Sequence, residues 1–260
     1  LVAGLGTSLA IDLGLAEAHA AADPAERLTF GTLEPLVSLM QESPLPKLLP
    51  ALAAKIKDGT ELRTLVAAGA LANARTFGGQ DYTGYHAFMA LPPALEMTNE
   101  MPTDRKALPV LKVLYRNSSR IQAHGGTRNE VLHPIAAEVS AEVSGEALQA
   151  ATRKADMTTA EKVFANIKKT DDAFNALQWT IQDEVDVHRV VLSWRAWTML
   201  DIAGPEHAHS LLRQSVRFCV DSEKTRLDRK RPEPGIRTLL PKLLDAHKLP
   251  NKTCLLYTSD

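Results

Sequence analysis

The chain has 260 residues, of which 45% are hydrophobic and 23% are charged. Its 30 basic and 31 acidic side chains leave a net charge of -1. This balance is typical of a soluble globular protein and argues against nucleic acid as the main partner, because phosphate binding needs a basic face.

Both ends of the sequence look incomplete or foreign. The chain starts at Leu1 inside an apolar pattern, so we expect the N-terminus to be truncated. Residues 254–260, CLLYTSD, resemble the translated sequencing-adaptor tail found in metagenomic reading frames, and we expect no specific packing there. Without Cys254 only Cys219 remains, which excludes an internal disulfide or a cysteine-based zinc cluster.

No segment has the length and apolarity of a membrane span. The most apolar stretch, 1–22, is interrupted by Asp12 and Glu17 and is rich in glycine and alanine. We therefore expect a cytoplasmic protein with no membrane partner, in which residues 1–253 form a single helical domain.

The first half of the chain shows apolar residues at three- and four-residue spacing, which is typical of amphipathic helices. This pattern covers 32–41, 45–58, 60–75 and 103–122. Within the last of these, we expect Pro109 to kink the helix, because proline removes a backbone donor.

The second half repeats the helical pattern after the turn at 124–127. It predicts helical segments at 134–155, 158–203 (two or three helices), 204–223 and 235–249. Gly204 and Pro205 give a good start signal for the helix at 204–223. Alternating β-branched strands are absent, so we predict an all-α fold: a single irregular bundle of about eight to ten helices.

The segment FGGQDYTGYHAFMALPPALEM, 77–97, concentrates polar and aromatic residues in a chain otherwise rich in alanine and leucine. Gly78-Gly79 is expected to end one helix, since glycine accepts the left-handed conformation of a C-cap. Asp81 can cap the next helix, predicted over 82–91 and stopped by Pro92-Pro93.

On that short helix Tyr82 and His86 lie one turn apart, and Tyr85 lies beside them. A tyrosine–histidine face can hold a substrate carbonyl, bind a metal or pass a proton. The alternative is a buried structural histidine with tyrosines as interfacial packing.

A second concentration lies at 179–209, which contains all three tryptophans. Helical spacing places Glu184, His188 and Arg195 on one stripe, opposite Val187, Val190 and Val191. Such a stripe suits an anionic or oxygen-rich ligand. It equally suits a surface ion pair, worth only about 0.3–0.5 kcal/mol.

Metal motifs are weak in this sequence. A di-iron site needs Glu-x-x-His on two helices, whereas only Glu130 and His133 match, and Pro134 disfavours helical geometry at His133. No His-Glu-x-x-His motif is present. We therefore assign no metal ligands, although a mononuclear or haem site built from scattered histidines stays open. The cofactor and the oligomeric state are unknown from the sequence.

Two segments together resemble the questin oxidase-like family. They are RTFGGQDYTGYHAFMALPPALEM and, much later, VHRVVLSWRAWTMLDIAGPEHAHSLL, which are similar to it in layout, whereas the fuller HPLIHLGY-like run of that family is reduced here to the single His86. The resemblance implies an oxygen-inserting oxidoreductase acting on polycyclic or ketone substrates, with His86 and His188 in its pocket.

Two classes of function follow. The first is a helical oxidoreductase or small-molecule-binding protein in which His86 and His188 converge as catalytic residues. In this interpretation Asp81 orients His86 or a water, and Arg195 neutralises an anion. The expected ligand-binding residues are Asp81, Tyr82, Tyr85, Trp194, Arg195 and His209. The second class is a non-catalytic helical scaffold or interaction module.

Overall fold

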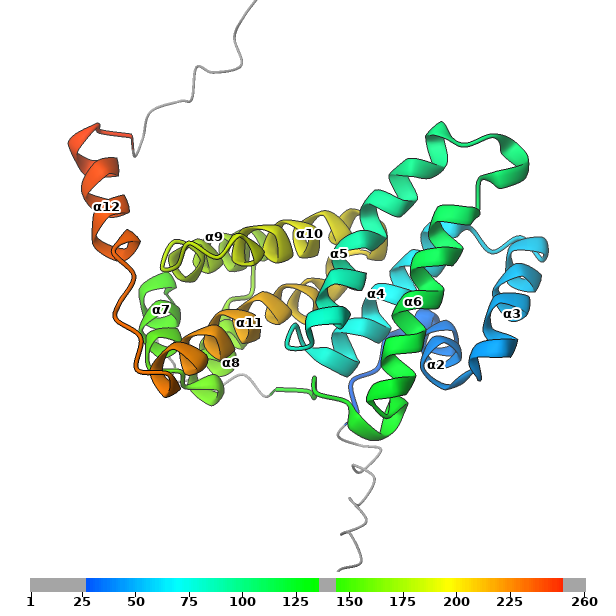
Figure 1. Cartoon of the computed structure of the whole chain (residues 1–260), viewed down its shortest axis with the longest axis horizontal. Helices are drawn as coiled ribbons and strands as arrows, with labels where there is room; N and C mark the ends of the chain where they lie inside the picture. The colour runs from blue at the N-terminus through cyan, green and yellow to red at the C-terminus, as the bar shows by residue number, and fades with distance from the viewer. Residues whose placement is uncertain (1–26, 136–143, 250–260) are drawn as a thin grey trace, which may run out of the picture.

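The computed structural model describes residues 27–135 and 144–249, and Figure 1 shows their arrangement. Within these ranges all regular structure is helical, with no strand, which confirms the all-α prediction. The described residues form eleven α-helices joined by short 3-10 turns, slightly more than the sequence led us to expect.

The helices fall in two groups along the long axis of Figure 1. The first group contains α2 (Glu34–Glu42), α3 (Leu45–Lys57), α4 (Leu62–Phe77), α5 (Tyr82–Glu96) and α6 (Leu108–His124). The second contains α7 (Gly145–Arg153), α8 (Met157–Asn166), α9 (Thr170–Ile181), α10 (Val187–Ala203), α11 (Ala208–Asp228) and α12 (Ile236–Ala246). Helices α10 and α11 pack on each other and on α4, which joins the two groups.

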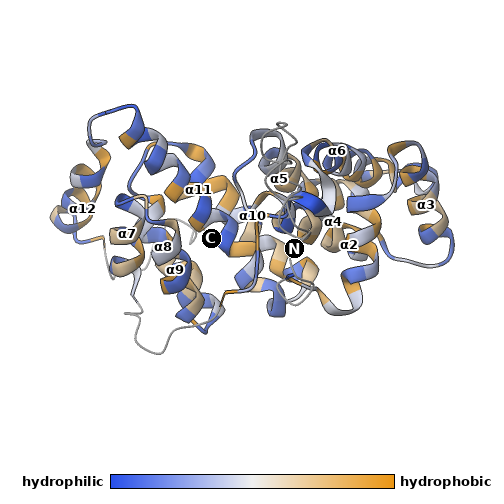
Figure 2. Ribbon diagram, turned by 90° about the horizontal axis from the view of Figure 1, so that it is seen from below, coloured by the Kyte–Doolittle hydropathy of each residue, from blue (hydrophilic) through white to orange (hydrophobic). Residues whose placement is uncertain are grey.

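Helix α4 is the centre of the first group. Every residue from Leu65 to Phe77 is buried, and many of them are alanines, so neighbouring helices can approach closely. In Figure 2 the surrounding helices carry both hydrophobic and hydrophilic residues along their length, as helices with one buried side do. This packing holds α5 and α10 against α4, and these two helices carry the expected site.

Helix α5 does not stop at Pro92-Pro93, so that expectation was wrong. The helix continues to Glu96, although each proline lacks the N–H that an interior helical position would donate. Leu91, Pro92 and Ala94 are buried. Burial of this apolar face offsets the two missing hydrogen bonds.

Two further proline and glycine signals act differently from expectation. Pro109 lies in the first turn of α6, where its missing N–H costs nothing, so it starts that helix instead of kinking it. Gly204 caps a helical segment that begins at Pro205, as expected, but this segment is the short 3-10 turn Pro205–His207, and α11 itself begins at Ala208.

Parts of three sequence predictions fall outside the described residues: the N-terminal stretch 1–22, part of the helix at 134–155, and the tail at 254–260. Among the helices that are described, none combines the length and apolar character needed to cross a membrane.

Candidate functional site

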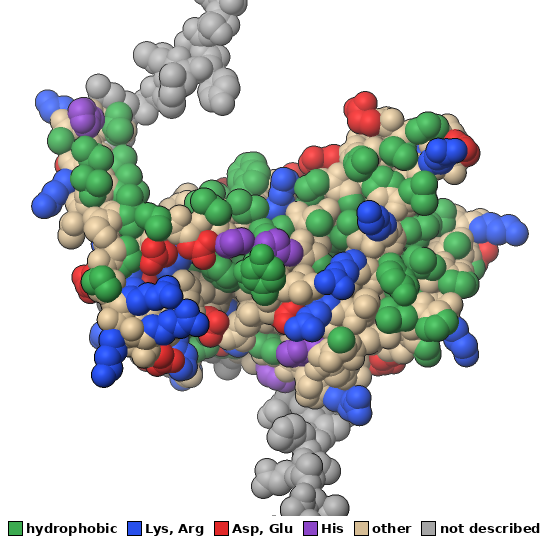
Figure 3. All heavy atoms as spheres, viewed as in Figure 1, with side chains coloured by type: hydrophobic (Ala, Val, Ile, Leu, Met, Phe, Trp, Pro, Cys, Tyr) green, Lys and Arg blue, Asp and Glu red, His purple; other side chains and the backbone are tan. Residues whose placement is uncertain are grey.

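The structure brings His86 and His188 together. His86 lies in the first half of α5 and His188 in the first turn of α10, and their ring centroids are 5.2 Å apart. Histidine side chains are visible at the middle of the face shown in Figure 3, with acidic side chains beside them. Two residues far apart in sequence thus form one cluster at the surface of the molecule.

The start of α5 is fixed by short-range contacts that the sequence signals. Gly78 ends α4 with a left-handed φ of 52°, and the Asp81 carboxylate caps α5 by accepting from the Gly84 N–H at 2.6 Å. Gly84 also allows α5 to approach α4, because a Cβ there would lie 2.6 Å from the Phe77 ring. These contacts set the position of the turn that carries His86.

The tautomer of His86 follows from its partner. Its Nδ1 lies 2.7 Å from the Tyr82 carbonyl oxygen, one turn earlier in the helix. A carbonyl oxygen only accepts hydrogen bonds, so Nδ1 carries the proton and donates. In the neutral ring the lone pair is then on Nε2.

His188 is held by Asp186, a residue that the sequence analysis did not single out. The Asp186 carboxylate accepts from the His188 backbone N–H at 3.0 Å and lies 2.7 Å from its ring Nδ1. One carboxylate therefore caps α10 and orients the imidazole, again leaving Nε2 as the nitrogen with the lone pair. The available signal was an aspartate two residues before a histidine at a predicted helix start.

Aromatic rings surround the two histidines. The Tyr82 ring lies 4.4 Å from His86, and the Tyr85 ring lies 4.7 Å from His86 and 5.5 Å from His188. Phe218 on α11 closes the far side, 5.2 Å from Tyr85. Burial, together with the charge of Asp186, raises the pKa of Tyr85 to about 12, so its hydroxyl stays protonated and can donate a hydrogen bond near neutral pH.

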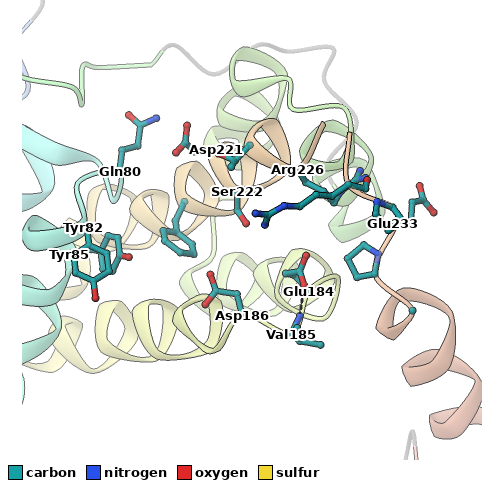
Figure 4. A pocket seen from close by; sticks show the side chains of 16 residues that line it. Gln80, Tyr82, Tyr85, Glu184, Val185, Asp186, Asp221, Ser222, Arg226 and Glu233 are labelled. Atoms are coloured by element: carbon teal, nitrogen blue, oxygen red, sulfur yellow. Dashed lines mark hydrogen bonds between the residues drawn. The ribbon is translucent and has the colours of Figure 1, made fainter. Parts of the chain in front are cut away.

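Two hollows meet at this cluster. A polar pocket of about 730 Å³ lies on one side, with Tyr82 and Tyr85 at one end, Glu184 and Asp186 along one wall, and Ser222 on α11 opposite (Figure 4). An apolar groove of about 850 Å³ lies on the other side, between α5 and α6. Tyr82 borders both hollows and His86 borders the groove, whereas His188 lines neither and is joined to them through its contacts with Asp186, His86 and Tyr85.

The groove has an almost wholly apolar floor. Ala87, Ala90 and Ala94 of α5 line it together with Met97, and Val113 of α6 lines the opposite side. Small side chains on α5 leave the space, and the two methionines at its end, Met97 and Met101, can adjust to an apolar ligand. An apolar groove beside a few fixed polar groups is the usual construction of a small-molecule site.

Four of the expected site residues lie elsewhere or make other contacts. Asp81 gives its carboxylate to Arg120, at 2.5 Å, and not to His86. Trp194 lies on an exposed face near Phe174, and His209 packs against Phe164 near the start of α11. Arg195 lies two turns beyond His188 along α10 and lines neither hollow.

An apolar stripe of α10, made of three valines and a tryptophan, is exposed. Val187, Val190, Val191 and Trp194 are 66%, 55%, 39% and 51% exposed. The buried face of α10 instead contains Arg189, Leu192 and Ala196. Hydrophobicity alone did not identify the buried side because Arg189 is paired inside with Glu223.

Among the described residues, no group of three or more histidine, cysteine, aspartate or glutamate side chains is placed to hold a metal. Comparison of the chain with protein-family models, with curated proteins and with solved structures finds no match. The questin oxidase-like resemblance therefore stays a prediction, and the functional argument depends on the geometry of the site.

Proposed function

We propose that this chain is a small-molecule-binding protein that acts on its ligand through His86 and His188. The observation that carries the proposal is the pair of imidazoles on adjoining helices, each with Nδ1 already hydrogen-bonded. Both Nε2 atoms are left to accept a hydrogen bond or a proton from a bound molecule.

The surroundings favour a ligand that is apolar along most of its length. Its apolar part would occupy the groove between α5 and α6, and its polar end would lie at the histidines and the polar pocket. The protonated Tyr85 hydroxyl and the two imidazoles would then act on a hydroxyl or carbonyl group at that end. Proton transfer is the reaction class that these groups support.

Oxygen insertion is a narrower proposal that depends on the questin oxidase-like resemblance alone. Insertion of one atom of O2 leaves the other to be reduced to water by two electrons, so the proposal predicts oxygen consumption when the purified protein meets a polycyclic phenol or ketone together with a reduced nicotinamide as electron donor. An oxygen electrode tests this directly, and the His86→Ala and His188→Ala variants give the matched controls.

Ligand binding can be tested without knowing the reaction. We would titrate the 15N-labelled protein with a panel of aromatic phenols and ketones and follow the imidazole nitrogens by NMR. The expected result is that one or more compounds shift the Nε2 signals of His86 and His188, while Trp194→Ala leaves binding unchanged. Compounds that bind without moving either signal would contradict the proposal.

A second candidate function is a helical scaffold or interaction module, and the exposed apolar stripe of α10 favours it. Val187, Val190, Val191 and Trp194 recur at helical spacing and have no covering element among the described residues. Light scattering would test this candidate: wild type should self-associate or bind a partner, and Val190→Glu with Trp194→Glu should abolish that association while leaving the histidine signals unchanged.

A further inference from the structure

The hydrogen bonds of the two Nδ1 atoms bear on more than proton transfer. Each donates its Nδ1 proton to an oxygen that is fixed by a helix: the Tyr82 carbonyl for His86 and the Asp186 carboxylate for His188. Metal-binding histidines have this arrangement, because the oxygen fixes the ring orientation and makes the other nitrogen a better ligand.

The separation of the rings fits the same interpretation. Two imidazoles bound through Nε2 to one tetrahedral metal ion place their ring centres about 5 Å apart, given metal–nitrogen bonds of about 2.0 Å. The ring centroids of His86 and His188 are 5.2 Å apart, with the planes inclined at 73°. The centroid separation is therefore that of two imidazoles on one ion, provided that each ring turns its Nε2 toward the space between them.

We infer that His86 and His188 bind a divalent transition metal ion of the zinc or copper type. Imidazole nitrogen is a ligand that these ions prefer. The described residues place no third protein ligand there, so water or the bound small molecule would have to fill at least two positions of a tetrahedral ion. The half-exposed His188, with 31% of its side chain accessible, leaves that approach open.

This inference deepens the proposed function. It depends on that function only for the identity of the small molecule that occupies the remaining coordination positions of the metal ion. A metal ion there would make a bound water acidic enough to supply hydroxide near neutral pH, or would polarise a ligand carbonyl. The imidazoles would then hold the ion, and the metal-bound water would exchange the proton. The apolar groove would keep its role of holding the rest of the ligand.

The test is a titration of chelator-treated protein with zinc chloride and, separately, with copper(II) chloride, without any organic ligand. Calorimetry should give one zinc ion per chain. The electron paramagnetic resonance spectrum of the copper form should show coupling to two imidazole nitrogens. A copper spectrum with no such coupling would overturn the inference even if every variant failed to fold.

Variants assign the binding to these residues. His86→Ala and His188→Ala should each weaken zinc binding at least about tenfold, and Asp186→Asn should weaken it about tenfold through the loss of its carboxylate. His133→Ala and His247→Ala, which alter exposed histidines elsewhere, should leave it unchanged. Circular dichroism checks that each variant is folded.

Two outcomes separate this inference from the proposed function. The metal site is refuted if zinc binding is unaffected by His86→Ala and by His188→Ala, or if wild type binds zinc no more tightly than a chain that carries both substitutions. If the chelated protein still binds an organic ligand at the histidines, the proposed function stands alone. If metal binds but no ligand does, the metal site stands and the proposed function falls.

Discussion

Asp186 has two roles at the candidate site, and two substitutions separate them. Its carboxylate accepts from the backbone N–H and from the ring Nδ1 of His188. Asparagine is an equally good N-cap, whereas alanine is not. We expect Asp186→Ala to lower the free energy of unfolding by about 1 kcal/mol and Asp186→Asn to change it by less than about 0.5 kcal/mol.

Urea unfolding measures both values, and NMR of the imidazole nitrogens reports the orientation of His188. In Asp186→Asn the helix should be intact while the His188 signals broaden or shift. Equal losses of stability in the two variants would show that the carboxylate charge, and not the cap, stabilises this end of α10.

His209 gives a prediction for the dependence of stability on pH. Burial, and then the charges of Arg213 and Lys168, lower its pKa from 6.5 to about 4. The folded protein therefore favours the neutral ring, and the unfolded chain takes up the proton first as the pH falls. Stability from this group is present above pH 6.5 and is lost as the pH falls toward 4.

Chemical denaturation between pH 7 and pH 4 measures this effect. Wild type should lose more stability over that range than His209→Gln, which has no group to protonate. An NMR titration of the ring gives the pKa directly. A His209 pKa close to 6.5 in the folded protein would contradict the prediction.

At the scale of elements, the turn between α4 and α5 packs closely against α11. Gly79 has a left-handed φ of 82°, and a Cβ there would lie 2.3 Å from the Gln214 backbone oxygen. Gly59 also has a left-handed φ, 93°, but a Cβ on that residue would meet nothing within 4 Å. Both glycines therefore have a positive φ, but only Gly79 lacks room for a Cβ atom.

Replacing each glycine with alanine should separate these effects. Gly59→Ala should cost about 1 kcal/mol, because alanine is strained in the left-handed region. Gly79→Ala should cost more than about 2 kcal/mol, because the turn or α11 must also move. Thermal and urea unfolding of the two variants provide the comparison, and equal costs would show that the contact with Gln214 is easily relieved.

The helices themselves could be predicted because most of them pack one apolar stripe against α4 or α11, and that stripe appears as regular spacing. The end of α5 could not, since the packing of Pro92 and Ala94 outweighs a local rule about proline. The buried side of α10 was also hidden. One face of α10 has four apolar residues and is exposed, whereas the face that contains Arg189 is buried in the core.

The candidate site was predictable in part. Clusters of rare aromatic and histidine residues identified the two helices that carry His86 and His188. Their partners were harder to find. Asp81 forms an ion pair with Arg120 on α6, and the His209 ring packs against Phe164 on α8. Both contacts depend on how helices distant in sequence pack together. Helical spacing reports which residues share a face, but not which face meets a neighbour.

At the scale of the whole molecule, one buried carboxylate joins three helices. Glu223 of α11 pairs with Arg189 of α10 at 3.0 Å, with Arg226 of its own helix at 2.9 Å, and with Arg237 of α12. Arg237 is the buried residue of α12, which otherwise projects from the body in Figure 1. Attachment of α12 therefore depends largely on this pairing.

Glu223→Gln should destabilise the fold strongly, because it leaves three buried guanidinium groups without their counter-charge. Removal of one partner from a buried ion pair typically costs about 3–5 kcal/mol. The matched control is Asp228→Asn on the same helix, whose pair with Lys224 is 62% exposed on both sides and should cost less than about 1 kcal/mol. Urea unfolding measures both variants, and hydrogen exchange shows whether α12 detaches first. If Glu223→Gln is no less stable than Asp228→Asn, then burial of the arginine stems, and not the charge of Glu223, holds α10, α11 and α12 together.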